Sequence, residues 1–107
     1  KDGIGKGMTR EDHPDVSSQL FAAYSRVKSL RSLAAVIGEE ELSVLDKKYI
    51  NFGNRFEAEF LSQDEHENRT IEETLDLGWK ILETLPRSEL LRINEKILNK
   101  YLPEEKE

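Results

Sequence analysis

The first residues of the chain have a composition that is typical of phosphate-binding loops, with three glycines beside a lysine and a threonine within residues 3–9. In a P-loop, a glycine-rich backbone and a lysine hold the phosphates, and a Ser or Thr directly after the lysine binds the magnesium ion. Here Lys6 is followed by Gly7, no glycine stands five residues before Gly5, and no strand pattern precedes the segment. The dinucleotide pattern G-x-G-x-x-G is not met either. We therefore interpret the segment as a mobile loop and not as a self-contained phosphate site.

Two histidines and 22 acidic residues are the other side chains that could perform acid–base or metal chemistry. His13 and His66 are far apart in the sequence, and neither has a second histidine at the i, i+4 spacing of a helical zinc site. A catalytic carboxylate pair needs burial or a close like charge to shift its pKa values, and no such pair can be recognised. The chain also lacks cysteine and the G-x-S-x-G motif. The sequence therefore predicts no catalytic residue and no metal site.

The densest negative charge lies in residues 38–46, Gly-Glu-Glu-Glu-Leu-Ser-Val-Leu-Asp, which we call the acidic elbow. It separates two helical patterns. One interpretation is a polar helix–helix turn, because acidic residues are favourable near the positive end of a helix dipole. The other is an exposed surface that meets a basic partner. The residues alone leave both interpretations open.

The overall composition narrows the class of protein. A length of 107 residues fits one domain. The net charge of −6 argues against a nucleic-acid binder, since neutralising phosphates requires Lys and Arg, and against adhesion to an anionic membrane. The longest apolar runs are only a few residues, too short to cross a bilayer, so we expect no direct membrane insertion.

Apolar residues at steps of three or four predict two long helices in the first half of the chain. The first is expected over residues 14–37, with Gly38 ending it in a left-handed conformation. The second is expected to follow a weak Ser43–Asp46 cap and to run to about Ser62. The apolar stripes are Val16, Leu20, Ala23, Tyr24, Val27, Leu30, Ala34 and Ile37 in the first helix, and Leu45, Tyr49, Phe52, Phe56 and Phe60 in the second.

The second half of the chain shows two further helical patterns after residues 63–69, a polar segment that we expect to be an exposed loop. Thr70 and Glu73 form a capping box that starts a third helix, on which Gly78 would permit close packing. A fourth helix is expected over residues 88–101. No segment alternates with the period of a strand. The sequence thus predicts an all-α bundle of about four principal helices over residues 14–107, with a flexible Gly-rich segment at residues 1–13.

Three stretches of the sequence resemble a known family: "GIGKGMTREDHPDVSSQLFAAYSRV", "LAAVIGEEELSVLDKKY" and "RTIEETLDLGWKILETLP". They are similar to the C-terminal region of the non-catalytic (beta) subunit of A-type and V-type rotary ATP synthases, with the archaeal A-type enzyme most similar in character. The resemblance runs from about Gly3 to about Pro86, and we expect it to include the last helix. It implies that residues 1–13 are the remnant of a preceding nucleotide-binding-type domain and that the bundle is the C-terminal domain.

The resemblance also implies a role and partners. In this family the non-catalytic beta chain alternates with a catalytic subunit in a hexamer around a central rotary stalk. The fragment would hold no cofactor of its own, while the whole complex uses ATP or ADP with Mg²⁺ to drive or exploit proton or sodium transport. The location implied is peripheral, on the cytoplasmic side of the cell membrane.

Two groups of site residues follow from the resemblance. The acidic elbow is similar to the "DELSEED" helix–turn–helix of F-type β subunits, which lies near the stalk, although Val44 and Leu45 stand where that motif has acids. The family's arginine that reaches the neighbouring nucleotide site lies upstream of this chain, so neither Lys6 nor Arg10 is assigned to catalysis. Candidate stalk contacts are Glu39, Glu40, Glu41, Leu42, Ser43 and Asp46, and candidate subunit-interface residues are Gly3, Gly5, Lys6, Gly7 and Arg10.

Two other functions remain as alternatives at this point. The first is a free-standing acidic helical adaptor that binds a basic protein through its acidic face. The second is an enzyme that binds nucleotide through the Gly–Lys segment, and the failed P-loop pattern argues against it. For the latter we expect no ATP binding tighter than millimolar by this chain alone.

Overall fold

The computed structural model of the protein describes residues 10–61 and 70–102, and these form helices, turns and short connections without any strand. The all-α prediction is therefore confirmed. The expected loop at residues 63–69 and the glycines of the first segment lie outside the described residues. In chain order the elements are α1 (His13–Ile37), the 3₁₀ turn η1 (Glu39–Glu41), α2 (Val44–Arg55), the π-helical turn η2 (Phe56–Phe60), α4 (Ile71–Leu82), the 3₁₀ turn η3 (Arg87–Glu89) and α5 (Glu95–Tyr101).

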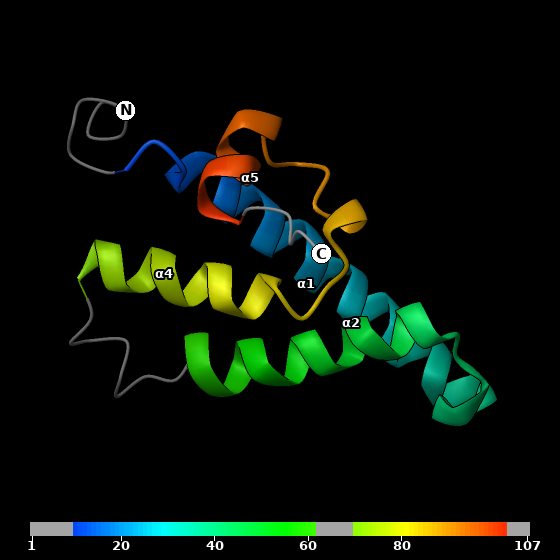
Figure 1. The fold of residues 1–107 in the computed structure, drawn as a ribbon. Helices are drawn as coiled ribbons and strands as arrows, with labels where there is room; N and C mark the ends of the chain where they lie inside the picture. The colour runs from blue at the N-terminus through cyan, green and yellow to red at the C-terminus, as the bar shows by residue number, and fades with distance from the viewer. Residues whose placement is uncertain (1–9, 62–69, 103–107) are drawn as a thin grey trace.

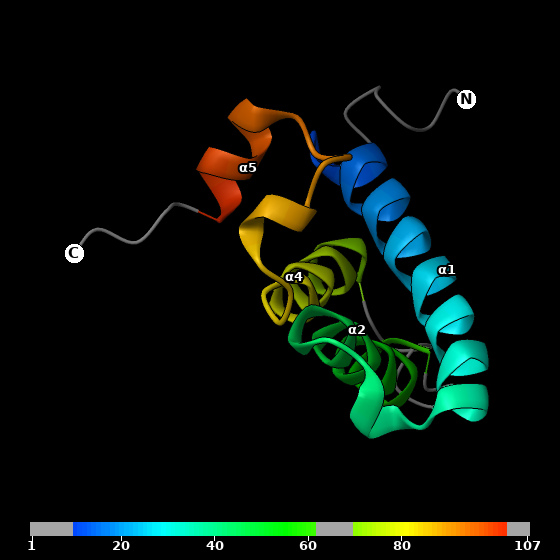
Figure 2. The same ribbon diagram turned by 90° about the vertical axis from the view of Figure 1, so that its right-hand side faces the viewer.

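The long helix α1 forms one side of the molecule, and α2 and α4 lie side by side against it (Figures 1 and 2). The short helix α5 lies near the start of α1, whereas the turn between α1 and α2 lies at the opposite end (Figure 1). A 25-residue helix is about 37 Å long. Its length therefore separates two distinct ends of the bundle.

Gly38 ends α1, as predicted, but in a different backbone conformation from the one expected. Its φ of 98° is positive and its ψ is 138°, so the residue is extended and not left-handed helical. Its N–H still donates to the carbonyl of Ala34, 2.8 Å away. The reason for the difference is that the chain turns at once into η1, where the N–H of Glu41 donates to the carbonyl of Gly38.

The second helix begins where predicted. Ser43 Oγ accepts from the backbone N–H of Asp46 at 3.0 Å, which confirms the N-cap. The helix continues through η2, where the N–H of Leu61 donates to the carbonyl of Phe56 five residues earlier. The rings of Phe52, Phe56 and Phe60 stack in sequence along this helix, with centroids 5.7 Å and 5.1 Å apart.

The third helix, α4, also begins at its predicted capping box. Thr70 Oγ1 accepts from the N–H of Glu73 at 3.1 Å, and Glu73 Oε1 accepts from the N–H of Thr70 at 3.0 Å. Gly78 is buried against α1, and a Cβ there would lie only 3.2 Å from Val16 Cγ1 and 3.3 Å from Leu20 Cδ1. The close helix packing expected at Gly78 is therefore present.

The prediction of a fourth helix over residues 88–101 is wrong for its first half. Only Glu95–Tyr101 is α-helical, and residues 90–94 run without helix after η3. The physical reason is that α1 satisfies the backbone here: Gln19 Oε1 accepts from the N–H of Arg92, and Asp15 Oδ2 from the N–H of Asn94, both at 2.8 Å. Asn94 then caps α5 by accepting from the N–H of Lys96.

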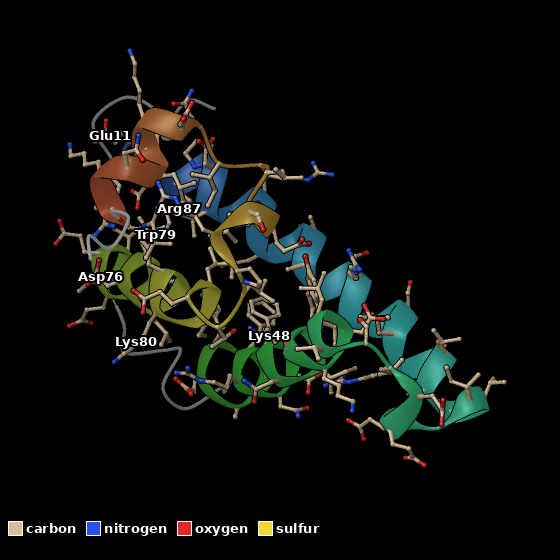
Figure 3. The ribbon with its side chains drawn as sticks, turned by 45° about the vertical axis from the view of Figure 1, so that its right-hand side comes forward. Glu11, Lys48, Asp76, Trp79, Lys80 and Arg87 are labelled. Atoms are coloured by element: carbon tan, nitrogen blue, oxygen red, sulfur yellow. The ribbon has the colours of Figure 1, made fainter. Side chains whose placement is uncertain are left out.

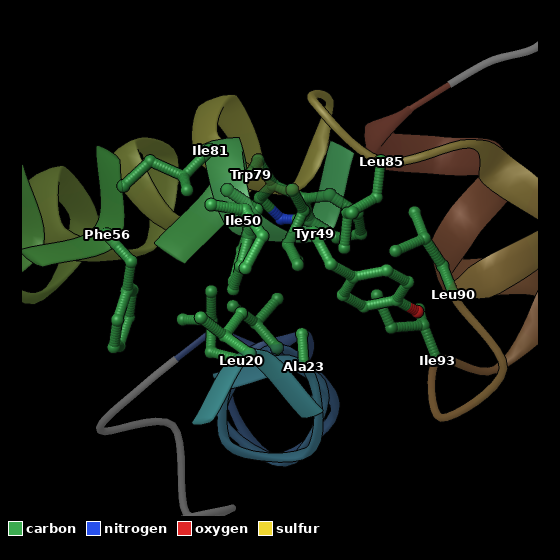
Figure 4. Close-up of a cluster of buried hydrophobic side chains, with 14 of the residues drawn as sticks. Leu20, Ala23, Tyr49, Ile50, Phe56, Trp79, Ile81, Leu85, Leu90 and Ile93 are labelled. Atoms are coloured by element: carbon green, nitrogen blue, oxygen red, sulfur yellow. The ribbon is translucent and has the colours of Figure 1, made fainter. Parts of the chain in front are cut away.

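Apolar side chains from α1, α2, η2, α4, α5 and the connections between them meet in one core (Figure 4). Burial of this surface is the main favourable contribution to folding. The stripes predicted from the sequence supply most of the core, except at the end of α1, where Ile37 is 43% exposed. The buried apolar residues are Val16, Leu20, Ala23, Val27, Leu30, Leu42, Tyr49, Ile50, Phe52, Phe56, Leu75, Trp79, Ile81, Leu82, Leu85, Leu90, Ile93 and Leu98.

Candidate functional site

The acidic elbow forms the tip of the molecule between α1 and α2 (Figure 1). Glu39, Glu40 and Glu41 make up η1, and all three side chains are exposed. Within the part of the chain that the structure describes, these three carboxylates take part in no hydrogen bond or ion pair. The tip therefore carries three uncompensated negative charges next to one another.

The structure separates the six predicted stalk contacts into two groups. Leu42 is buried in the core, and Asp46 is half-buried and accepts from Arg26 at 3.4 Å. Ser43 is exposed, but its hydroxyl oxygen caps α2. The three glutamates are thus the charged groups of the elbow that face solvent without a partner among the described residues.

Exposed apolar side chains flank the glutamates. Of the two apolar residues that the resemblance to the F-type motif indicated here, Val44 is exposed and Leu45 is half-buried. Val36 is 81% exposed and Val44 73%, and Ile37 and Leu33 are also exposed. Leu33, Val36 and Ile37 are exposed because they lie in the last turns of α1, which extend past α4 and α5 (Figure 1). Val36 is an apolar residue outside the helical stripe that ends at Ile37, and this position was the signal in the sequence for its exposure. The elbow surface is consequently mixed, with acidic and apolar groups side by side.

The opposite end of the molecule holds a network that we call the N-terminal clamp: Arg10, Glu11 and Asp12 with their partners Asp76, Trp79, Lys100 and Tyr101. Its centre is Asp12, whose side chain is completely buried. The Asp12 carboxylate accepts from Arg10 Nε at 3.1 Å, from Arg10 Nη2 at 2.7 Å and from Trp79 Nε1 at 2.7 Å. The buried charge is therefore both paired and hydrogen-bonded, as a buried charge must be.

These contacts keep Asp12 ionised. Burial alone would raise the pKa of its carboxyl, but the hydrogen bonds from Arg10 and Trp79 outweigh burial, and the pKa is lowered. The pKa of Arg10 is raised, mainly by its hydrogen bond to Asp12.

The outer part of the clamp surrounds this centre. Arg10 Nη1 donates to Asp76 Oδ1 at 2.7 Å, and its guanidinium lies 4.9 Å from the centre of the Tyr101 ring. Glu11 Oε2 accepts from Lys100 Nζ at 2.5 Å and from the Tyr101 hydroxyl at 3.2 Å. Figure 3 shows Glu11, Asp76 and Trp79 at this same end of the molecule. Of the predicted interface residues, Arg10 alone lies in the described part of the chain.

A third polar network joins α1 to η2 between the two ends. Glu57 accepts from Arg31 at 2.7 Å and 3.1 Å and from the Tyr24 hydroxyl at 2.5 Å. The hydrogen bonds from Arg31, and then from Tyr24, lower the pKa of Glu57 to about 2. No local pattern in the sequence signals this network, because its members are 26 and 33 residues apart.

Other surfaces of the described residues offer little for chemistry. No group of three or more His, Asp or Glu side chains within residues 10–61 and 70–102 could hold a metal ion. His13 opens α1, and His66 lies outside the described residues. Phe21 is 76% exposed beside Tyr24 and Arg92 on an open groove of about 470 Å³, while the neighbouring Leu20 is buried. None of the helices in the described ranges is long and apolar enough to span a bilayer.

Comparison with known proteins identifies the family. Residues 2–102 match the family described as the C-terminal domain of V and A type ATP synthase. The chain is similar to the V-type ATP synthase beta chain 2 of Treponema pallidum, with 63% identity over 102 residues, which is 95% of this chain and 21% of that protein. It is also similar to V-type ATP synthase beta chains of Halothermothrix orenii, with 64% identity over 101 residues, and of Thermotoga neapolitana, with 58% identity over 101 residues, in each case 94% of this chain and 22% of the relative.

These matches confirm the resemblance to the beta chain, and they do so along nearly the whole chain, including α5. The chain spans about a fifth of the length of these relatives. The relatives come from bacteria, so they give no support to the archaeal character expected from the sequence. The chain belongs to the family of C-terminal domains of V- and A-type ATP synthases.

Proposed function

We propose that this bundle is the C-terminal domain of a non-catalytic beta chain, and that its acidic elbow contacts the central rotary stalk of the complex. The observation that carries the proposal is the set of three exposed glutamates, Glu39–Glu41, which have no partner among the described residues and lie at the end of the bundle remote from the clamp. Three adjacent like charges repel one another, and no described residue compensates them. A basic partner would supply that compensation.

The apolar residues beside the glutamates fit a contact that slides. Val36, Ile37 and Val44 offer non-directional contact, whereas the carboxylates offer long-range attraction that salt screens. A small surface of this kind suits a transient interface and not a permanent one. We extend the proposal to Leu42, Ser43 and Asp46 as residues that shape the elbow: Leu42 anchors it in the core, and Ser43 and Asp46 form the cap of α2.

The test uses the full-length beta chain with its catalytic partner and the stalk. Charge reversal at Glu39, Glu40 and Glu41 to lysine is expected to weaken stalk binding and to lower coupled ATP hydrolysis. The matched control reverses three exposed acids elsewhere, Glu72, Glu83 and Glu95. The proposal fails if the elbow variant matches the wild type in both measurements, or if the control variant is impaired to the same degree.

The nucleotide chemistry is proposed for the whole complex and not for this domain. ATP or ADP with Mg²⁺ would be bound elsewhere, with catalysis on the neighbouring catalytic subunits. The segment around Gly3, Gly5, Lys6, Gly7 and Arg10 would lie near such a neighbour, and the complex would sit at the cytoplasmic side of the membrane, driven by protons or sodium. Calorimetry of this chain with ATP and Mg²⁺ is expected to show no binding tighter than millimolar, and micromolar binding would contradict the proposal.

The free-standing adaptor is the weaker hypothesis. The relatives that cover nearly all of this chain are named as ATP synthase beta chains, and they favour the rotary complex.

A further inference from the structure

The N-terminal clamp uses a helix-capping position for a different purpose. Asp12 stands at the N-cap of α1, where an aspartate usually accepts from the N–H groups of its own first turn. Its side chain makes no capping hydrogen bond and accepts instead from Trp79 of α4, 67 residues away in the sequence. The Asp12 side chain therefore does not stabilise the first turn of α1. It forms a tertiary hydrogen bond that joins the segment before α1 to helix α4.

The clamp holds the same segment to α5 as well. Arg10 and Glu11 contact Tyr101, Glu11 also pairs with Lys100, and Tyr101 stacks on Trp79 with ring centroids 5.6 Å apart. Each of the three consecutive residues 10–12 is therefore bound by a side chain of α4 or α5.

Helix α5 depends on such contacts because it has only seven residues. A helix of this length is not stable alone in water. Besides the clamp, Arg87 of η3 donates to the carbonyl of Leu102 and to Asn99 Oδ1. The position of α5 is thus set on one side by η3 and on the other by the residues that lead into α1.

Burial makes the clamp stronger than an ordinary surface ion pair. Exposed pairs contribute little and exchange freely with water. Separating Asp12 from Arg10 and Trp79 would leave the Asp12 charge and the Trp79 N–H unpaired in the interior, which is strongly unfavourable. The contact therefore resists being pulled apart.

We propose that the N-terminal clamp is a mechanical coupling site: residues 10–12 move as one body with α4 and α5, so that a displacement of the chain before Arg10 is carried directly into the bundle. This inference rests on the proposed function, in which a larger part of the beta chain precedes the bundle.

The first test measures whether the clamp fixes α5 to α4. The sequence has no cysteine, so cysteines introduced at the exposed positions Glu72 and Lys96 can carry a unique pair of spin labels. Trp79→Phe removes the N–H donor and retains a ring to stack on Tyr101, and Asp12→Asn removes the charge. Both variants are expected to broaden the distribution of distances between the labels.

Two controls accompany this measurement. A second label pair at the exposed positions Ser29 and Asn51, on α1 and α2, is expected to keep its distribution in both variants. Asp76→Asn, which removes only the charge of an exposed outer partner of Arg10, is expected to broaden the first distribution less. The inference is overturned if Trp79→Phe and Asp12→Asn leave the first distribution unchanged, or if the control pair broadens equally.

The second test uses the full-length beta chain in complex with the catalytic subunits and the stalk. The Trp79→Phe complex is expected to assemble and to transport fewer ions per ATP hydrolysed than the wild type. If Trp79→Phe broadens the label distances but transports as many ions per ATP as the wild type, the coupling role is contradicted, while the role of the clamp in fixing α5 stands. Failure of the wild-type beta chain to assemble with these partners would instead contradict the proposed function.

Discussion

The two ends of the bundle both carry acidic residues, but they use them in opposite ways. At the N-terminal clamp, Glu11, Asp12 and Asp76 each have a cationic partner within 2.7 Å. At the acidic elbow, Glu39–Glu41 have no partner among the described residues. A run of charge in the sequence therefore has no single meaning. Paired acids hold the molecule together, whereas unpaired acids at a tip are free to bind a partner.

The largest effect on stability is expected from Asp12→Ala at the clamp. The substitution leaves Nε and Nη2 of Arg10 and the Trp79 N–H without their acceptor, and we expect a loss of about 3 kcal/mol in the free energy of unfolding. Urea denaturation monitored by the fluorescence of Trp79, the single tryptophan of the chain, measures it. A loss below that of a typical surface substitution would show that the clamp contributes nothing to stability.

A smaller effect is expected from Gly38→Ala, which alters the shape of the elbow and not its charge. The φ of 98° at this residue is unfavourable for a side chain with a Cβ, and we expect a cost of about 2 kcal/mol. Thermal unfolding of this variant should be compared with Ser32→Ala, an exposed helical position nearby. Equal melting temperatures for the two variants would mean that the backbone at the elbow is not fixed in this conformation.

Glu57→Gln tests a paired acid midway between the two ends and should depend on pH. Its pKa is lowered from 4.5 to about 2 in the folded chain, so ionised Glu57 stabilises the fold above about pH 4.5, and this stabilisation is lost as the pH falls toward 2. At pH 7 we expect Glu57→Gln to lose about 1 kcal/mol, because the pair is partly exposed.

Denaturant midpoints of the wild type and Glu57→Gln, compared at pH 7 and pH 3, test this expectation. The difference between the two proteins should shrink at pH 3. Glu40→Gln provides the matched control, since it makes the same chemical change at an exposed acid and should show little difference at either pH. A difference for Glu57→Gln that stays constant with pH would contradict the pairing with Arg31.

The smallest effect on stability is expected from the elbow itself. The triple change Glu39→Gln, Glu40→Gln and Glu41→Gln should alter the free energy of unfolding by less than about 0.5 kcal/mol, because no described partner is lost. Calorimetric melting of the isolated domain measures this. A loss comparable to that of Asp12→Ala would make the elbow a structural element and remove the contrast between the two ends.

Much of the fold could be predicted because its signals are local. The Thr70–Glu73 capping box, the Ser43 cap and the phenylalanine stripe of α2 and η2 each join residues that are neighbours along one helix. The prediction of the fourth helix failed for a long-range reason. Residues 90–94 are not helical because Gln19 and Asp15 satisfy their backbone from more than 70 residues away, which no local pattern can indicate.

The two candidate sites differ in the same respect, since one has a local signal in the sequence and the other depends on long-range contacts. The elbow could be predicted, because a run of three glutamates between two helices is visible in the sequence. The clamp could not, because its centre joins Asp12 to Trp79 across 67 residues. A partial signal was present: a buried tryptophan N–H usually needs an acceptor, and Trp79 lies beside the packing glycine Gly78 on a helix predicted to be in the core.

The most direct test of the stalk contact is the ratio of ions transported to ATP hydrolysed in the complete complex carrying Glu39→Lys, Glu40→Lys and Glu41→Lys. We predict that the complex assembles, that the domain keeps its stability, and that the ratio falls below that of both the wild type and the Glu72, Glu83 and Glu95 reversal. A ratio equal to that of the wild type, in a complex that has assembled normally, would contradict the assignment of the elbow to the stalk.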